Sequence, residues 1–308
     1  LSPAADALSP AQTAALQRAQ QLVDAVLGQL GEASSDTAQA AQTLRADLLA
    51  AQGQTSEATD AYQAVLLQDP DNATAIEGLA RMLLAAGAAD EAIARYQAAA
   101  DAAETSAGRN RWLMTIGAAY RSLARPAEAE QVYRDILAAD PANSAAHQAL
   151  GDLYQAANRL EEAVAEYRLA AEAAPAGDVE MAFRLGRALL QVGQVEEAGQ
   201  LAQALLAASP SAWQSYLLTA RVALAQGDPT AALTTLRQAQ SLAPTNSTAL
   251  TLIGDSFLAA GRSDDAADRL AFGRPFGHKV PSIAPGRSLS HGCGCSSGVE
   301  HDLAKVGV

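Results

Sequence analysis

Residues 144–177 read SAAHQALGDLYQAANRLEEAVAEYRLAAEAAPAG, and this stretch holds the pattern that decides the fold. Gly151 and Ala163 are small residues set in two apolar, alanine-rich segments, and Pro175 follows the second segment. Small side chains let two helices approach closely where they cross, and a proline cannot continue a helix. The stretch therefore predicts a helix, a short turn and a second helix that packs on the first.

The same pattern returns along the chain with a period of about 34 residues. Pro141 and Pro175 are 34 residues apart, as are Pro210 and Pro244, and Pro175 and Pro210 are 35 apart. The interval from Pro70 to Pro141 is 71 residues, which equals two units plus a three-residue insertion around residues 107–109. A fixed period of this length is typical of repeat architectures.

Three columns of residues share this register. The first column holds only alanine: Ala58, Ala92, Ala129, Ala163, Ala198, Ala232 and Ala266. The second column holds only glycine or alanine: Ala46, Ala80, Gly117, Gly151, Gly186, Ala220 and Gly254. The third column is mostly bulky: Tyr62, Tyr96, Tyr133, Tyr167, Ala202, Leu236 and Leu270. We expect the small columns to lie where the two helices of a unit cross and the bulky column to fill the space against the next unit.

The repeating unit resembles the tetratricopeptide repeat. In residues 144–177 the match rests on Leu150-Gly151, Tyr154, Ala163, Tyr167, Ala170 and Pro175. The resemblance implies an all-α fold, a right-handed α-solenoid of about seven helix hairpins. The expected units are 39–72, 73–106, 110–143, 144–177, 179–212, 213–246 and 247–272, within one domain at 39–272. Residues 1–38 are expected to form an N-terminal capping region, with a helix that starts at Ser9-Pro10 and runs to about Gln29.

The segment at 273–308 departs from the repeat pattern. It is rich in Gly, Pro and Ser and is predicted to be a disordered, non-native tail. His291, Cys293, Cys295 and His301 offer four metal ligands, but a Cys-x-Cys without a matching second pair is not the usual zinc spacing, so no metal site is predicted. Residues 293–308 resemble the translation of a bacterial transfer-RNA gene, which predicts that the natural reading frame was lost near Phe272.

Composition excludes several classes of function. The formal net charge of −13 argues against nucleic-acid binding, which needs a basic surface. No stretch reaches the 18 or more apolar residues of a membrane span. The sequence shows neither a Gly-rich phosphate loop nor a nucleophile motif, so neither a cofactor nor an enzymatic activity is predicted. His147, Trp112 and Trp213 are interpreted as packing residues.

The resemblance also points to a binding surface, because the first helix of each unit lines the concave side in that family. The side chains expected there are Arg81, Arg111, Arg121, Phe183, Arg184, Arg187, Leu217 and Arg221, with Met114, Leu190 and Leu224 beside them. Arginines can bind carboxylates through paired hydrogen bonds. The family's clamp for chaperone C-termini uses lysine and asparagine at set places, and those places carry Asp, Arg or Ala here.

Three functions therefore stay open. The leading prediction is a bacterial scaffold or adaptor, monomeric or weakly self-associating, that binds an acidic peptide or protein in its groove. The alternative is a substrate-recruiting domain of a larger, truncated enzyme such as a glycosyltransferase or sulfotransferase. A self-associating structural array is the third. The compartment stays open between the cytoplasm and the periplasm or envelope, because the sequence begins at Leu1 without a methionine.

Overall fold

The computed structural model describes residues 9–30, 36–175, 177–243 and 247–261, and these residues form helices and turns with no strand. The helices are α1 (Pro10–Leu30), α2 (Asp36–Ala51), α3 (Thr55–Gln68), α4 (Ala73–Ala85), α5 (Ala89–Ala102), α6 (Ser106–Ser122), α7 (Pro126–Ala139), α8 (Ser144–Ala156), α9 (Leu160–Ala173), α10 (Val179–Gln191), α11 (Val195–Ala208), α12 (Trp213–Ala225), α13 (Pro229–Leu242) and α14 (Ser247–Ala259). The predicted all-α solenoid is confirmed.

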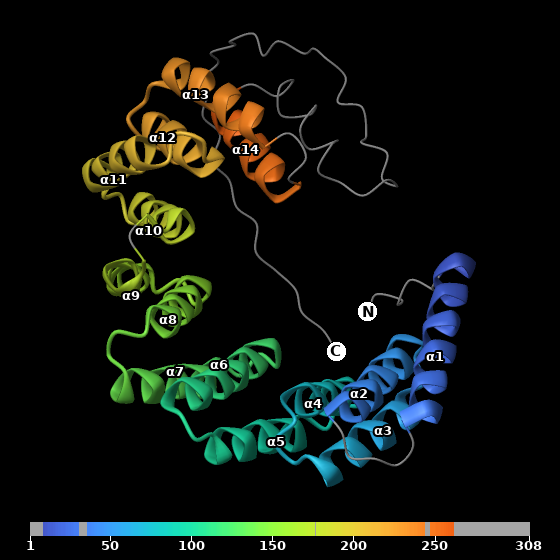
Figure 1. Cartoon of the computed structure of the whole chain (residues 1–308). Helices are drawn as coiled ribbons and strands as arrows, with labels where there is room; N and C mark the ends of the chain where they lie inside the picture. The colour runs from blue at the N-terminus through green and yellow to red at the C-terminus, as the bar shows by residue number, and fades with distance from the viewer. Residues whose placement is uncertain (1–8, 31–35, 176, 244–246, 262–308) are drawn as a thin grey trace, which may run out of the picture.

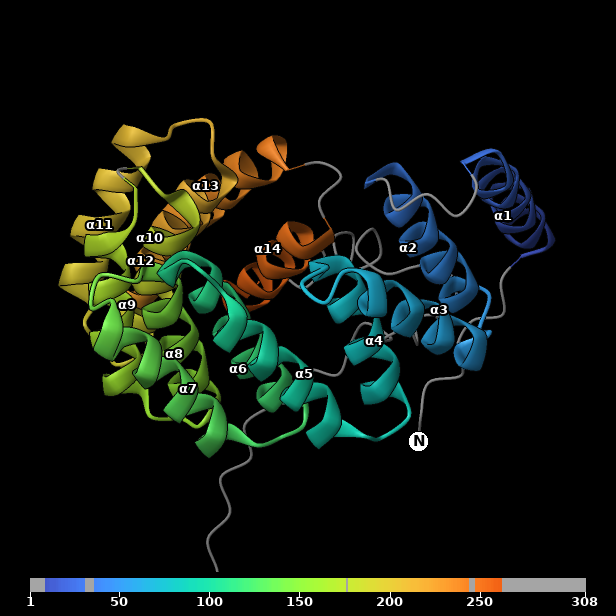
Figure 2. The ribbon, with the colours of Figure 1, turned by 60° about the horizontal axis from the view of Figure 1, so that its bottom comes forward.

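The helices follow one another around an open arc (Figure 1). The even-numbered helices from α2 to α14 form an inner row, and the odd-numbered helices from α3 to α13 form an outer row. The view turned by 60° shows the same order of helix pairs along the curve (Figure 2). We call the inner row the first helices and the outer row the second helices, because each inner helix comes first in its pair.

The turn between the paired helices is built by one residue in the left-handed region. Gly193 has φ 77°, which glycine adopts without a Cβ penalty. Ala124 and Asn158 take the same conformation with φ 56° and 58°, so two of the turns form without glycine. Left-handed residues of this kind end a helix and let the chain reverse.

The three residues that interrupt the period belong to α6. This helix begins at Ser106, and the Thr105 side chain accepts a hydrogen bond from the Gly108 backbone N–H at 3.1 Å. An accepted bond of this kind satisfies one of the free N–H groups at a helix start. The insertion therefore lengthens α6 by most of a turn.

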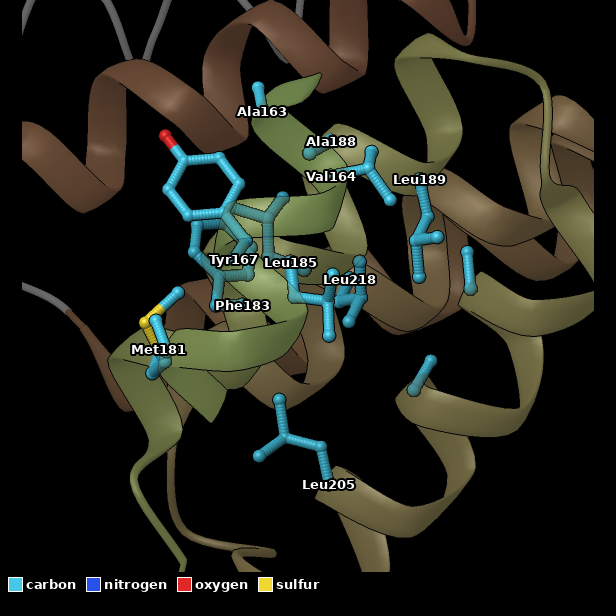
Figure 3. Close-up of a cluster of buried hydrophobic side chains, with 14 of the residues drawn as sticks. Ala163, Val164, Tyr167, Met181, Phe183, Leu185, Ala188, Leu189, Leu205 and Leu218 are labelled. Carbon is cyan, nitrogen blue, oxygen red and sulfur yellow. The ribbon is translucent and has the colours of Figure 1, made fainter. Parts of the chain in front are cut away.

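The three columns are buried wherever the structure describes them. In the alanine column, Ala58, Ala92, Ala129, Ala163, Ala198 and Ala232 are each 0% exposed. The glycine and alanine column is also buried, and so are the tyrosines of the bulky column. Figure 3 shows the result between two pairs: Ala163, Val164 and Tyr167 of α9 lie against Met181, Phe183 and Leu185 of α10.

Helix α1 packs on α2 at the N-terminal end of the arc. Two hydrogen bonds fix the start of α1. The Gln12 side chain accepts from the Ser9 backbone N–H, and the Ser9 side chain accepts from the Gln12 backbone N–H. Arg45 of α2 forms an ion pair with Asp24 at 3.2 Å, and Val23 is buried. The predictions for Ala266, Leu270 and the tail at 273–308 lie outside the described residues.

Candidate functional site

The candidate site is the inner wall, the side of the first helices that faces the inside of the arc (Figure 1). Three arginines on it connect the first helices of successive pairs through carboxylates. Arg81 Nη2 of α4 lies 3.8 Å from Asp47 Oδ1 of α2. Arg111 Nη2 of α6 lies 2.6 Å from Glu77 Oε1 of α4. Arg184 of α10 lies 3.0 Å from Asp152 of α8. These six side chains hold neighbouring pairs together along the wall.

Three other arginines of the predicted strip make no ion pair within the described part of the chain. They are Arg121, Arg187 and Arg221. The Arg187 guanidinium lies over the Phe183 ring, 5.8 Å from its centroid, and Arg221 Nε donates to Ser256 Oγ at 3.3 Å. Arg121 lines an open pocket of about 640 Å³ between the C-terminal ends of α6 and α8.

Two of the predicted site residues are not on the surface. Phe183 is 2% exposed and Leu217 is 0% exposed, so both belong to the core. Phe183 lies edge-on to Trp213 with the ring centroids 5.8 Å apart. The prediction that Phe183 and Leu217 contact a partner at the surface was wrong, because α10 and α12 pack directly on each other and cover these two positions. Met114, Leu190 and Leu224 are only partly buried and remain on the wall.

The direct packing of α10 on α12 follows from one residue in the bulky column. In two other pairs, a tyrosine ring fills the space over the glycine. A Cβ on Gly117 would lie 2.3 Å from the Tyr133 ring, and a Cβ on Gly151 would lie 2.5 Å from the Tyr167 ring. The pair α10–α11 has Ala202 in place of that tyrosine. There, Leu218 of α12 fills the space over Gly186, with its Cδ2 2.5 Å from the ideal Cβ position.

Two buried tyrosines bind aspartates of the wall, a contact that the sequence analysis missed. Tyr62 Oη donates to Asp47 at 2.5 Å, and Tyr167 Oη donates to Asp152 at 2.6 Å. Burial and then the bond to Asp152 raise the pKa of Tyr167. In both pairs an aspartate follows the small column directly and a tyrosine stands fifteen residues later, which is the signal that could have found the contact.

His147, Trp112 and Trp213 have packing surroundings. His147 is buried, and its Nδ1 and Nε2 lie 2.7 Å from Glu166 Oε2 and 3.0 Å from the Pro141 carbonyl oxygen. Trp112 stacks on Tyr96 with centroids 5.9 Å apart, and the contact of Trp213 with Phe183 is given above. Both ring nitrogens of His147 thus have hydrogen-bond partners within the protein.

Among the described residues, no three or more His, Cys, Asp or Glu side chains are grouped to hold a metal ion. The four candidate ligands of the tail lie outside those residues; they are His291, Cys293, Cys295 and His301. Within the same part of the chain, no helix combines the length and the apolar character needed to cross a membrane.

Family models match most of the helical part of the chain. One model described as a tetratricopeptide repeat matches residues 43–107, 183–247 and 217–271, and a second with the same description matches residues 121–182. No curated protein matches the sequence.

Several solved structures are similar in shape. A tetratricopeptide repeat protein from Parabacteroides merdae is 18% identical with a TM-score of 0.49, and the match covers 79% of this chain and 92% of that one. A thermophilic repeat protein from Thermus thermophilus is 18% identical with a TM-score of 0.44, covering 53% and 88%. YrrB, described as having an unusual peptide-binding site, is 16% identical with a TM-score of 0.38, covering 53% and 83%.

Proposed function

Because the chain belongs to the tetratricopeptide repeat family, we propose that it is a non-catalytic scaffold that holds a polypeptide partner along its inner wall. The observation that carries the proposal is the group of arginines on that wall with no ion pair in the described residues, namely Arg121, Arg187 and Arg221. The whole chain has a net charge of −13. Positive groups that have no ion-pair partner on one wall of an acidic protein favour an acidic partner at that wall.

Apolar side chains beside these arginines support the same proposal. Met114 of α6, Leu190 of α10 and Leu224 of α12 are partly buried and keep some surface open on the wall. A strip that combines apolar contacts with arginines suits an amphipathic helix or an extended peptide that carries carboxylates.

The experiment compares the inner wall with the outer row by photo-crosslinking. A benzoylphenylalanine is placed at Leu224 on α12 or, as the control, at the exposed Gln203 on α11. Acidic peptides selected against the chain from a display library are then added and irradiated. We expect crosslinks from position 224 and none from position 203, and weaker binding at higher salt because exposed charges are screened. Crosslinks from position 203 alone, or equally from both, would contradict the proposal.

A further inference from the structure

Helix α1 has an apolar side that α2 does not cover. Each second helix from α3 to α13 packs on the first helix before it and on the first helix after it, whereas α1 packs mainly on α2 at the end of the arc (Figure 2). The side toward α2 holds the buried Val23 and Gln20, whose Oε1 accepts a hydrogen bond from Gln52 Nε2 at 2.8 Å. On the adjoining side, Leu22 is 69% exposed and Val26 is 42% exposed. A helix face that keeps large apolar side chains in water is a candidate contact surface.

These exposed positions belong to a stripe with the spacing of a coiled coil. Residues of α1 follow one another at alternating intervals of three and four, and we call them the outer seam: Gln12, Ala15, Ala19, Leu22, Val26 and Gln29. Ala19 is partly buried and the other members are exposed. Intervals of three and four place side chains on one side of a helix, where a second helix can cover them.

The outer seam is complementary to a second copy of itself that runs in the opposite direction. When two seams lie antiparallel about the point between residues 20 and 21, Leu22 of one copy faces Ala19 of the other. Val26 faces Ala15 in the same way, and the glutamines at the two ends face each other. A large side chain opposite a small one fills the space between two helices evenly. A parallel arrangement would instead set Leu22 on Leu22 and Ala15 on Ala15, which alternates crowded layers with gaps.

The charges of α1 also suit a contact between two copies. The whole chain has a net charge of −13, but α1 carries one arginine and one aspartate, Arg18 and Asp24, so its own net charge is zero. Asp24 is bound to Arg45 of α2 at 3.2 Å. The outer seam itself holds no charged residue, so neither an acidic nor a basic partner would find a counter-charge in it. Two copies can meet at this helix without bringing charges of one sign into contact.

We propose that the outer seam of α1 is the contact between two copies of this chain, which pair as a twofold dimer of antiparallel helices. This inference is independent of the peptide groove proposed for the inner wall. Helix α1 is about 30 Å long, and a contact limited to one such helix is smaller than the usual interface of about 800 Å² per partner. The dimer is therefore weak, and in dilute solution the chain is a monomer whose α1 stays exposed.

Sedimentation velocity of the full chain, measured at increasing protein concentration under reducing conditions, tests the dimer. We expect a monomer in dilute solution and a reversible dimer as the concentration approaches about 1 mM, with no larger species because a twofold contact closes on itself. Added salt should strengthen the dimer, because it screens the net negative charge of the two copies. A chain that stays monomeric throughout, or that forms larger species, overturns the proposal.

A variant of the seam and a matched control locate the contact. Leu22→Gln should raise the dissociation constant of the dimer at least about tenfold, because each copy loses a leucine that the contact buries. Leu67→Gln is the control, since Leu67 of α3 is 86% exposed and lies outside α1, and it should leave the dissociation constant unchanged. Both leucines are exposed in the monomer, so both variants should keep the circular dichroism of the parent chain. Equal dimerisation of the two variants would overturn the proposal.

Engineered cysteines test the direction of the two helices. Ala15→Cys and Val26→Cys are made in separate proteins, each in a background with Cys293→Ser and Cys295→Ser. The antiparallel seam sets position 15 against position 26, so a mixture of the two proteins should form a disulfide between them. Either protein alone should not, because its two cysteines would lie about 16 Å apart along the helices, beyond the roughly 7 Å that a disulfide spans between Cα atoms. Disulfides within each protein alone and none in the mixture would overturn the antiparallel dimer.

The outcomes separate this inference from the proposed function. A dimer that depends on Leu22, without any peptide crosslink from position 224, keeps the seam and rejects the peptide groove. Peptide crosslinks from position 224 on a chain that remains monomeric keep the groove and reject the seam. The salt dependence differs as well, because added salt should strengthen the dimer and weaken the binding of an acidic peptide.

Discussion

At the scale of single residues, the stack depends on the absence of a side chain at two buried glycines. An ideal Cβ on Gly151 would lie 2.5 Å from Tyr167 Cε1, and one on Gly117 would lie 2.3 Å from Tyr133 Cε1. Real Cβ contacts do not reach such distances, and the tyrosines are themselves 1% exposed with no free space to move into. Gly117 and Gly151 are therefore required by contact with a specific ring, and not only by the closeness of the helices.

Gly151→Ala should destabilise the protein by about 1–3 kcal/mol, because the added methyl overpacks the core against Tyr167. The matched control is Gly199→Ala on α11, where the nearest atom to the new Cβ is Val222 Cγ1 at an ordinary 3.5 Å. That change should stabilise by roughly 0.5–1 kcal/mol, because alanine favours the helix over glycine. Urea unfolding of both variants measures the difference, and a Gly151→Ala protein as stable as Gly199→Ala would refute the packing argument.

At the scale of helices, several of the first helices begin at a side-chain cap. Asn72, Asn143 and Asp178 accept hydrogen bonds from the backbone N–H three residues on, each at 3.0 Å. Ala212 holds the equivalent place before α12 and has an extended backbone, φ −87° and ψ 125°, but no side-chain acceptor. The same fold thus contains a capped and an uncapped version of one helix start.

This contrast gives a paired prediction. Asn143→Ala should lower the stability by about 0.5–2 kcal/mol, because the Ala146 N–H loses its partner. Ala212→Asn should raise the stability by up to about 1 kcal/mol, because the backbone is already in a conformation that suits a cap. Thermal melts of the two variants in the same buffer provide the measurement. Shifts of the same sign would show that the caps do not control these helix starts.

At the scale of the whole molecule, the core is a series of local clusters along the arc. One cluster joins α2, α3 and α4, a second joins α4, α5 and α6, and a third extends from α7 to α14. Stability in such an array is the sum of each pair's own stability and of the interfaces with its neighbours. Helices at the end of the array have a neighbour on one side only.

Amide hydrogen exchange should therefore vary along the chain. We expect α1 to exchange fastest, because it packs mainly on α2 and leaves Leu22 at 69% exposed. Helices α8 and α9 should exchange slowest, because they have neighbours on both sides and belong to the largest cluster. Uniform protection from α1 to α9, measured by mass spectrometry of peptic fragments, would instead indicate one cooperative unit.

The sequence by itself determined the repeat and the helical solenoid. The period of 34 residues and the small residues at Gly151 and Ala163 are local features, and each pair contacts only its neighbours. A pattern within one unit therefore predicts the packing of that unit without knowledge of distant contacts. The burial of every described member of the alanine column, at 0% exposure, confirms this part of the prediction.

Only the tertiary structure decided which side chains remain open on the inner wall. Periodicity placed Phe183 and Leu217 on the same helix face as Arg187 and Arg221, but the first two are buried whereas the two arginines are partly exposed. The difference arises between units, because Ala202 leaves space that Leu218 of the next pair fills, and α12 then covers α10. A contact between two units depends on both of their sequences and on the packing angle, which a pattern within one unit does not contain.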